Sequence, residues 1–120
     1  MKRVLIAEDD LDLRDIFSRA FEKRSFNVQV ARDGQETLDC LDMDSPDVLV
    51  LDINMPRVSG LDILTYIHQR QDLQDVKIII VTGSTKALYA PQIEYADILL
   101  TKPVSLRDLA DYAEELTAPV

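Results

Sequence analysis

The chain has 120 residues, 47% of them hydrophobic, so we expect a single domain over residues 1–120 and no second, output-bearing domain. The formal net charge of -9 argues against direct binding to nucleic acid or an anionic membrane, because both require basic surfaces. A lone cysteine, Cys40, cannot form an internal disulfide, and the apolar run Val4–Ala7 is too short for a signal or membrane segment, so we predict a cytoplasmic protein.

The first part of the chain alternates short apolar runs with segments of helical periodicity. Arg3–Ala7 predicts a buried strand, and the helix that follows has Asp10 or Asp12 available as its N-cap. Phe26–Ala31 alternates apolar and polar residues, which is typical of an edge strand with one wetter face. Asp33 then predicts the cap of a second helix.

The middle of the chain contains its most apolar strand. Val48–Leu51 is a run of four apolar residues after a turn signal, which predicts a strand buried on both faces. The strand should stop at Asp52, after which Asn54-Met55-Pro56 turns the chain away. Leu61, Leu64 and Ile67 recur at helical spacing and indicate a third helix.

The last part of the chain repeats this pattern with one irregular segment. Lys77–Thr82 predicts another buried strand, and Ile98–Leu100 a short final one. Between them, Thr85–Tyr95 contains Pro91, so any helix there should be short, kinked or begin at the proline. Ser105 then caps a final amphipathic helix.

Alternating strands and helices are typical of α/β proteins. Right-handed crossovers place the helices on both faces of a parallel sheet. We therefore predict a doubly wound, five-stranded parallel sheet in the flavodoxin-like order 2-1-3-4-5, with helices on both faces.

Several polar residues directly follow the predicted strands. The carboxyl ends of parallel strands share one edge, so these side chains should meet there: Glu8, Asp9, Asp52, Thr82 and Lys102. Three carboxylates would repel one another unless a cation neutralised them, and oxygen ligands without cysteine or histidine favour Mg²⁺. With Asp52 as nucleophile and Lys102 and Thr82 at the transferring oxygens, the set makes chemical sense as an aspartyl-phosphate site.

Each of these residues has an ordinary structural interpretation. An acid pair after a strand more often caps a helix, an isolated strand-end aspartate is most often a turn residue, and a lysine is most often a solvated charge. Only their joint placement at strand ends favours a reactive site. His68 is expected on the surface of the third helix, and Tyr89 and Tyr95 are expected to serve in packing or partner contacts.

Four motifs in order resemble the receiver domains of two-component response regulators over nearly the whole chain. They are Glu8-Asp9, Asp52 within Leu51–Pro56, Thr82-Gly83 and Lys102-Pro103. The resemblance implies that Asp52 takes a phosphoryl group from a histidine kinase or phosphotransfer protein. The domain would then signal through altered contacts with a downstream target protein or a separate output domain.

The resemblance also implies roles for single residues. Asp9 and Asp52 would ligate Mg²⁺ together with the Asn54 backbone carbonyl, and Glu8 would act through water. Lys102 would contact the phosphoryl oxygens and Thr82 would hydrogen-bond one of them. The Lys102-Pro103 peptide resembles the cis bond of the family.

Two departures from the family pattern concern how phosphorylation is reported. Leu99 stands where receivers usually carry Tyr or Phe, and Pro91 interrupts the segment that normally forms a helix of the signalling face. We expect the partner surface at this segment, the last strand and the last helix, which leaves phosphorylation-dependent dimerisation open.

Other functions remain as alternatives. A receiver-like module could signal without phosphorylation. A haloacid-dehalogenase-type phosphohydrolase would need a second acid where Asn54 stands, and a flavodoxin would need a phosphate-binding loop after the first strand. We expect a phosphoacceptor that undergoes self-phosphorylation and self-dephosphorylation on Asp52 and is not a turnover enzyme on external substrates.

Overall fold

The computed structural model describes residues 1–119 and contains one five-stranded sheet. Its strands are β1 (Arg3–Ala7), β2 (Asn27–Ala31), β3 (Val48–Leu51), β4 (Lys77–Thr82) and β5 (Ile98–Thr101). All neighbouring strands pair in parallel, in the order β2-β1-β3-β4-β5. The predicted fold class and strand order are confirmed.

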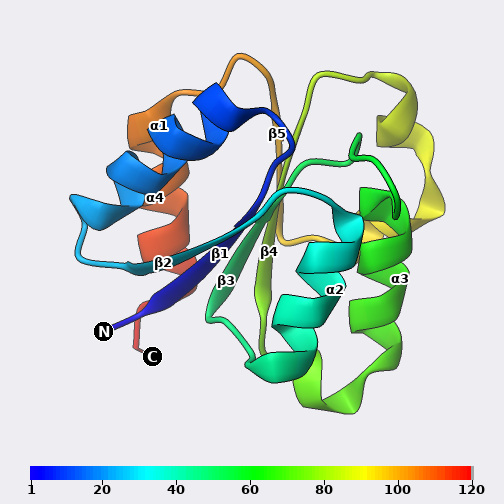
Figure 1. The fold of residues 1–120 in the computed structure, drawn as a ribbon, viewed down its shortest axis with the longest axis horizontal. Helices are drawn as coiled ribbons and strands as arrows, with labels where there is room; N and C mark the ends of the chain where they lie inside the picture. Colours follow the sequence, from blue (N-terminus) through cyan, green and yellow to red (C-terminus); the bar gives the residue numbers. More distant parts are fainter. Residues whose placement is uncertain (120) are drawn as a thin grey trace.

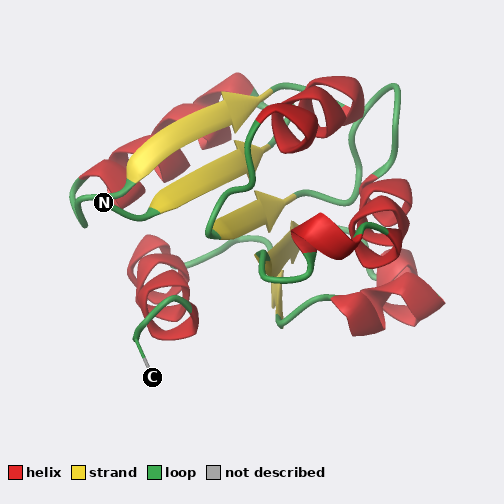
Figure 2. Ribbon diagram, turned by 90° about the horizontal axis from the view of Figure 1, so that it is seen from below, coloured by secondary structure: helices red, strands yellow, loops and turns green. Residues whose placement is uncertain are grey.

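Four α-helices cover the sheet from both sides (Figures 1 and 2). They are α1 (Leu11–Glu22), α2 (Gly34–Met43), α3 (Gly60–Gln69) and α4 (Leu106–Leu116). Helices α1 and α4 lie on one face, and α2 and α3 lie on the other (Figure 1). None of the helices among the described residues is both long and apolar enough to cross a membrane.

The two faces of the sheet support two separate apolar cores. Phe17 and Phe21 of α1 and Leu109 of α4 pack against one face, whereas Leu41 of α2 and Leu64 of α3 pack against the other. The β3 residues are buried whichever face they point to, as predicted from their continuous apolar run. This packing on both faces holds β3 in the middle of the sheet. Its last residue, Leu51, pairs with Ala7 at the end of β1.

Polar side chains fix the helix starts. Asp10, and not Asp12, caps α1 by accepting from the Leu13 amide at 3.1 Å, while Asp12 lies in the first turn. Asp33 caps α2 through the Glu36 amide at 2.8 Å, and Ser105 caps α4. Each cap satisfies a backbone donor that the helix itself cannot pair.

Strand β2 lies at the edge of the sheet, as predicted from its alternating pattern. It begins at Asn27, one residue after Phe26, and its apolar Val30 is 43% exposed. Ile16 of α1 and Leu106 of α4 recur at helical spacing with the buried apolar residues of their helices, yet they are 42% and 37% exposed. Helical spacing places a residue on a face, but whether a neighbouring element covers that position depends on the tertiary arrangement.

The connection between β4 and β5 contains no α-helix. It forms two short 3₁₀ helices, η2 (Lys86–Tyr89) and η3 (Pro91–Tyr95), and a further one, η1 (Gln71–Leu73), precedes β4. The proline begins η3, as its fixed backbone angle and missing amide favour. His68 is exposed on α3 as predicted, and its ring stacks on the Tyr95 ring with centroids 3.8 Å apart.

Candidate functional site

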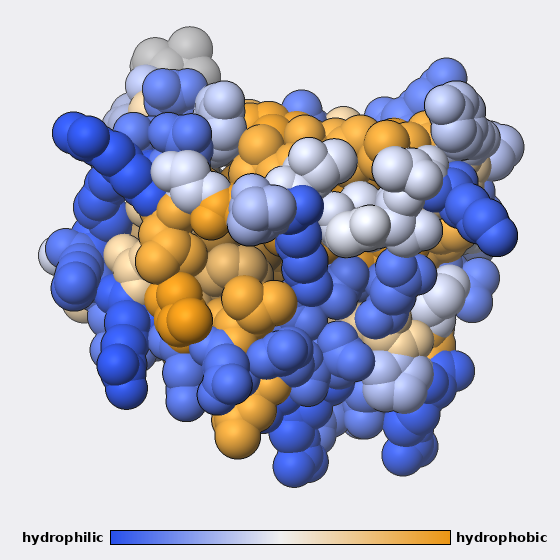
Figure 3. Space-filling view, turned by 90° about the horizontal axis from the view of Figure 1, so that it is seen from above, coloured by the Kyte–Doolittle hydropathy of each residue, from blue (hydrophilic) through white to orange (hydrophobic). Residues whose placement is uncertain are grey.

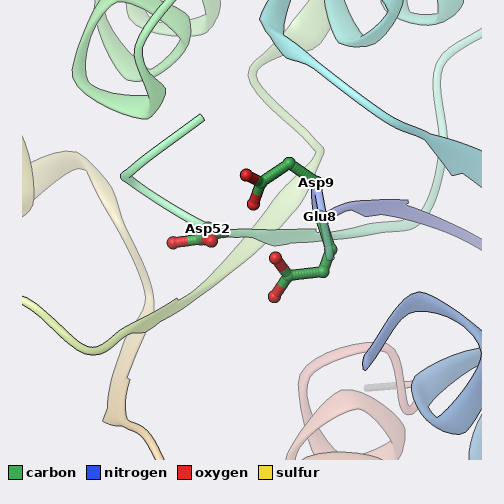
Figure 4. A group of neighbouring side chains, drawn as sticks. All are labelled: Glu8, Asp9 and Asp52. Atoms are coloured by element: carbon green, nitrogen blue, oxygen red, sulfur yellow. The ribbon is translucent and has the colours of Figure 1, made fainter. Parts of the chain in front are cut away.

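Strand register brings Glu8, Asp9 and Asp52 together at the carboxyl edge of the sheet. Ala7 pairs with Leu51, and the Asp52 amide donates to the Ala7 carbonyl at 3.0 Å, so the residues following both strands are neighbours. Glu8 and Asp52 are buried, whereas Asp9 is exposed. One oxygen from each carboxylate lies within 4.8 Å of the others, and the three groups face a common space (Figure 4).

Lys102 supplies a positive charge to this cluster. It follows β5, whose Thr101 pairs with Thr82, and its amide donates to the Thr82 carbonyl at 2.9 Å. Its Nζ lies 3.2 Å from Asp52 Oδ2, to which it donates a hydrogen bond, and 2.9 Å from Glu8 Oε1. The next peptide bond, Lys102-Pro103, is cis, as predicted.

Burial and charge shift the proton affinities of this site. Burial, the largest cause, and the neighbouring Asp52 carboxylate together raise the pKa of Glu8 to about 7, although the contact with Lys102 opposes the shift. Burial lowers the pKa of Lys102, but its contacts with Glu8 and Asp52 outweigh burial and hold that pKa above the ordinary value. Lys102 is therefore protonated near neutral pH, whereas Glu8, with a pKa of about 7, gains or loses its proton in that pH range.

The carboxylates fit a hard divalent cation. Two buried carboxylates, Glu8 and Asp52, share the Lys102 ammonium at 2.9 and 3.2 Å, and Asp9 forms no ion pair among the described residues. Three carboxylates around one ammonium leave negative charge that a divalent cation would neutralise. All three candidate ligands offer oxygen, which suits Mg²⁺ better than zinc.

The loop after β3 is held close to Asp52. The Asn54 amide donates to Asp52 Oδ1 at 3.1 Å, which orients the carboxylate. The Gly60 amide donates to the Ile53 carbonyl at 2.9 Å, so the start of α3 packs directly on this loop. A Cβ at position 60 would lie 2.6 Å from Ile53 Cα and 2.7 Å from the Asp52 carbonyl oxygen, so only glycine permits this approach.

Thr82 lies at the end of β4 with its side chain fully buried. Its hydroxyl oxygen accepts from the Ser84 amide at 3.1 Å, which orients it at the sheet edge. The structure thus brings Glu8, Asp9, Asp52 and Lys102 into one cluster and places Thr82 at the end of the adjoining strand. The ligand role of the Asn54 carbonyl and the phosphoryl contact of Thr82 stay predictions.

Sequence reasoning missed Arg14. Its guanidinium Nη1 donates to the Glu8 carbonyl at 3.1 Å and approaches the Asp9 carbonyl at 3.5 Å. A basic residue one turn inside the helix that follows an acid pair could have suggested a contact with that pair. Helical charge alone, however, does not tell whether such a side chain turns back toward the preceding loop.

Comparison with known proteins identifies a family. The family model described as response regulator receiver domain matches residues 4–114. Response regulator MprA of Mycolicibacterium vanbaalenii is 32% identical over 107 residues, which are 89% of this chain and 46% of that protein. Response regulator MprA of Mycobacterium tuberculosis strain H37Rv is 33% identical, also over 89% of this chain and 46% of its own length. The chain thus spans about half the length of these curated relatives.

Solved receiver structures superpose over almost the entire chain. The receiver domain of the Francisella response regulator 1452 has a TM-score of 0.87 at 28% identity, covering 98% of this chain and 97% of its own. Response regulator protein TrrA of Thermotoga maritima, solved in complex with Mg²⁺-BeF, has a TM-score of 0.87 at 26% identity, covering 97% and 99%. The chain belongs to the response regulator receiver domain family.

Proposed function

We propose that Asp52 is the phosphoacceptor of a two-component signalling domain. The observation that carries this proposal is the buried Asp52 carboxylate at a rigid strand end, 3.2 Å from the Lys102 ammonium and grouped with Glu8 and Asp9. A buried strand fixes the nucleophile in position, and the ammonium is available for negative charge on the incoming group.

In the proposed reaction, an Asp52 oxygen forms a bond to phosphorus as the bond between phosphorus and the donor's histidine nitrogen breaks. The electron pair of that bond leaves with the imidazole, and Asp52 becomes an acyl phosphate. Lys102 stabilises the charge on the phosphoryl oxygens, and the Thr82 hydroxyl donates a hydrogen bond to one of them. Hydrolysis returns the carboxylate and inorganic phosphate, so the domain is not a turnover enzyme on external substrates.

Mg²⁺ is the proposed cofactor, held by Asp9, Asp52 and the Asn54 carbonyl, with Glu8 acting through water. When bound, it neutralises charge between the carboxylates and the phosphoryl oxygens. The similar Thermotoga protein was solved with Mg²⁺-BeF, which supports this assignment. The three clustered carboxylates, which have one ammonium among them, support it further.

The proposed phosphodonor is a protein, either a histidine kinase or a phosphotransfer protein in the cytoplasm. The carboxyl edge of the sheet is the face seen in Figure 3, where apolar surface gathers among hydrophilic groups. Leu11, at the start of α1 and three residues after Glu8, is 61% exposed. Exposed apolar surface of this kind marks protein contacts. A downstream target or separate output domain would read the modified receiver, which we take as one domain over residues 1–120.

Incubation with acetyl phosphate and Mg²⁺, followed by intact-mass measurement, tests the proposal. We expect the mass of one phosphoryl group to be added to the wild type and none to the Asp52→Asn variant. Addition of EDTA should abolish the gain. No gain on the wild type with either acetyl phosphate or a phosphorylated histidine kinase would refute the proposal, as would an unchanged gain in Asp52→Asn.

A second candidate, a receiver-like module that signals by contact without phosphorylation, is favoured by one observation. Leu99 is 37% exposed where the family carries an aromatic residue, and the neighbouring connection lacks an α-helix. This candidate predicts that Asp52→Asn retains biological output, whereas phosphoacceptor signalling predicts its loss. Absence of turnover on phosphate esters would separately exclude a phosphohydrolase.

A further inference from the structure

The acidic turn after β1 has an unusual geometric requirement. Successive side chains of a strand point to opposite faces, yet Glu8 and Asp9 both contribute to the same cluster. The Glu8 amide still donates to the Ala31 carbonyl at 3.1 Å, as a continuation of the β1–β2 ladder. The chain then bends at Asp9 before α1 begins. The bend is therefore what directs the Asp9 carboxylate toward Asp52.

Arg14 holds this bend from the helix side. Its Nη1 donates to the Glu8 carbonyl at 3.1 Å and approaches the Asp9 carbonyl at 3.5 Å, so one guanidinium group contacts both residues. Between residues of the turn itself, the described part of the chain has one hydrogen bond, 3.3 Å from the Asp10 amide to Glu8 Oε2, while the Ala31 carbonyl and the Lys102 ammonium also hold Glu8. Arg14 makes no ion pair with a carboxylate in residues 1–119, so its charge is directed at these carbonyls.

The bend works against electrostatic repulsion. Asp9 forms no ion pair in the described part of the chain, and it faces the negative charges of Glu8 and Asp52. Without an anchor, repulsion from these two charges would turn the Asp9 carboxylate, which is already solvent-exposed, away from Asp52. Arg14 acts on the backbone and not on the carboxylates, so it fixes direction without occupying the space that the ligands share.

We propose that Arg14 is a positioning residue that sets the Glu8–Asp9 turn for Mg²⁺ binding. The inference rests on the proposed function, because it assumes that Asp9 is a metal ligand. Groups that orient metal ligands typically change affinity 10–100-fold when mutated. The expected direction is also diagnostic. Removing a cation near an acidic site should by itself strengthen Mg²⁺ binding, whereas loss of positioning weakens it.

The test is calorimetric titration of MgCl₂ into metal-free protein for four chains. We expect Arg14→Met to weaken Mg²⁺ binding by about tenfold. Arg14→Lys, which keeps the charge and can donate to one carbonyl, should recover part of the loss. Arg19→Met is the matched control, since it removes an exposed cation from the last turn of the same helix, and it should stay within about twofold of wild type because exposed charges are screened.

Thermal unfolding in EDTA separates positioning from a general loss of stability. Unchanged or tighter Mg²⁺ binding by Arg14→Met overturns the inference, whatever its melting temperature. An equal loss in Arg19→Met also overturns it. If the wild type binds no Mg²⁺, both the inference and the metal assignment fail. If Arg14→Met weakens Mg²⁺ binding but Asp52 takes no phosphoryl group, only the proposed phosphoacceptor function fails.

Discussion

The carboxyl edge of the sheet and the connection from β4 to β5 lie next to each other in this molecule but are built differently. At the edge, Glu8, Asp52 and Thr82 are buried and tied to strands that are packed on both faces. In the connection, η3 has no fully buried residue and η2 has only Ala87. The edge is therefore a preorganised site, whereas the two 3₁₀ helices contribute one buried residue, Ala87, and partly buried ones such as Ile93 to the core.

Under the proposed function, this difference separates the chemistry from its readout. The proposed chemistry at Asp52 needs groups fixed within a narrow geometry, which strands surrounded by apolar core provide. A segment that reports a chemical change needs a small free-energy difference between two arrangements, which a weakly packed segment provides. The His68–Tyr95 stack is one contact that holds η3 against α3. The following predictions test this contrast, in order of decreasing effect.

The largest effect should come from the pH dependence of stability in metal-free protein. The pKa of Glu8 is about 7 in the folded state against 4.5 ordinarily, so folded protein binds more protons in between. The free energy of unfolding should therefore fall as pH rises from about 4.5 to 7, by up to about 3 kcal/mol from this group.

Urea unfolding in EDTA at pH 5 and pH 8 measures this contribution. Glu8→Gln should lose it, so the variant should gain stability relative to wild type as the pH rises. Groups such as Glu36, whose pKa is lowered by its pairing with Arg32, titrate in both proteins and cancel in the difference. A difference that does not change with pH would show that the edge is less strained electrostatically than the structure indicates.

A pair of glycines tests how tightly the site is supported. Gly60→Ala forces a Cβ against the backbone of Asp52 and Ile53, so we expect a loss of roughly 2–3 kcal/mol in unfolding free energy together with slower phosphorylation. Gly83→Ala is the control, because its nearest neighbour is Lys102 Cδ at 3.9 Å, an ordinary contact. Chemical denaturation and intact-mass kinetics measure both effects. Equal behaviour of the two variants would contradict the prediction.

The ring stack on η3 should contribute less. Tyr95→Ala removes its contact with His68 and should cost about 1 kcal/mol. Faster amide hydrogen exchange should be concentrated in residues 86–96, while phosphorylation of Asp52 persists. Tyr89→Ala is the matched control. Tyr89 is 88% exposed, so its removal should change neither the unfolding free energy nor the amide exchange. Loss of protection spread over the sheet would show that the connection is not an independent unit.

The smallest effect on stability is expected at Leu99. It is 37% exposed on β5, so Leu99→Tyr should change the unfolding free energy by less than about 0.5 kcal/mol. Phosphorylation by acetyl phosphate should be equally fast, because the chemistry depends on the edge residues. A strong change in its rate would instead couple the readout region directly to the reaction.

The sequence alone determined the fold class and the main site candidates. Continuous apolar runs such as Val48–Leu51 identify strands buried on both faces, and parallel strands must end at one edge. Polar residues placed directly after such runs are therefore grouped before any contact is known. For the same reason the caps at Asp33 and Ser105 and the proline start of η3 were predictable, because they depend on local hydrogen bonding and backbone angles.

Only the tertiary structure decided the features that depend on contacts between distant residues. These include the 2.9 Å approach of Lys102 to Glu8, the exposure of Val30 and Ile16, and the close packing of Gly60 on the loop after β3. The turn of Arg14 back onto the Glu8 and Asp9 carbonyls belongs to the same class. Periodicity specifies which face a side chain takes, but its environment follows from which elements cover that face and how closely they approach.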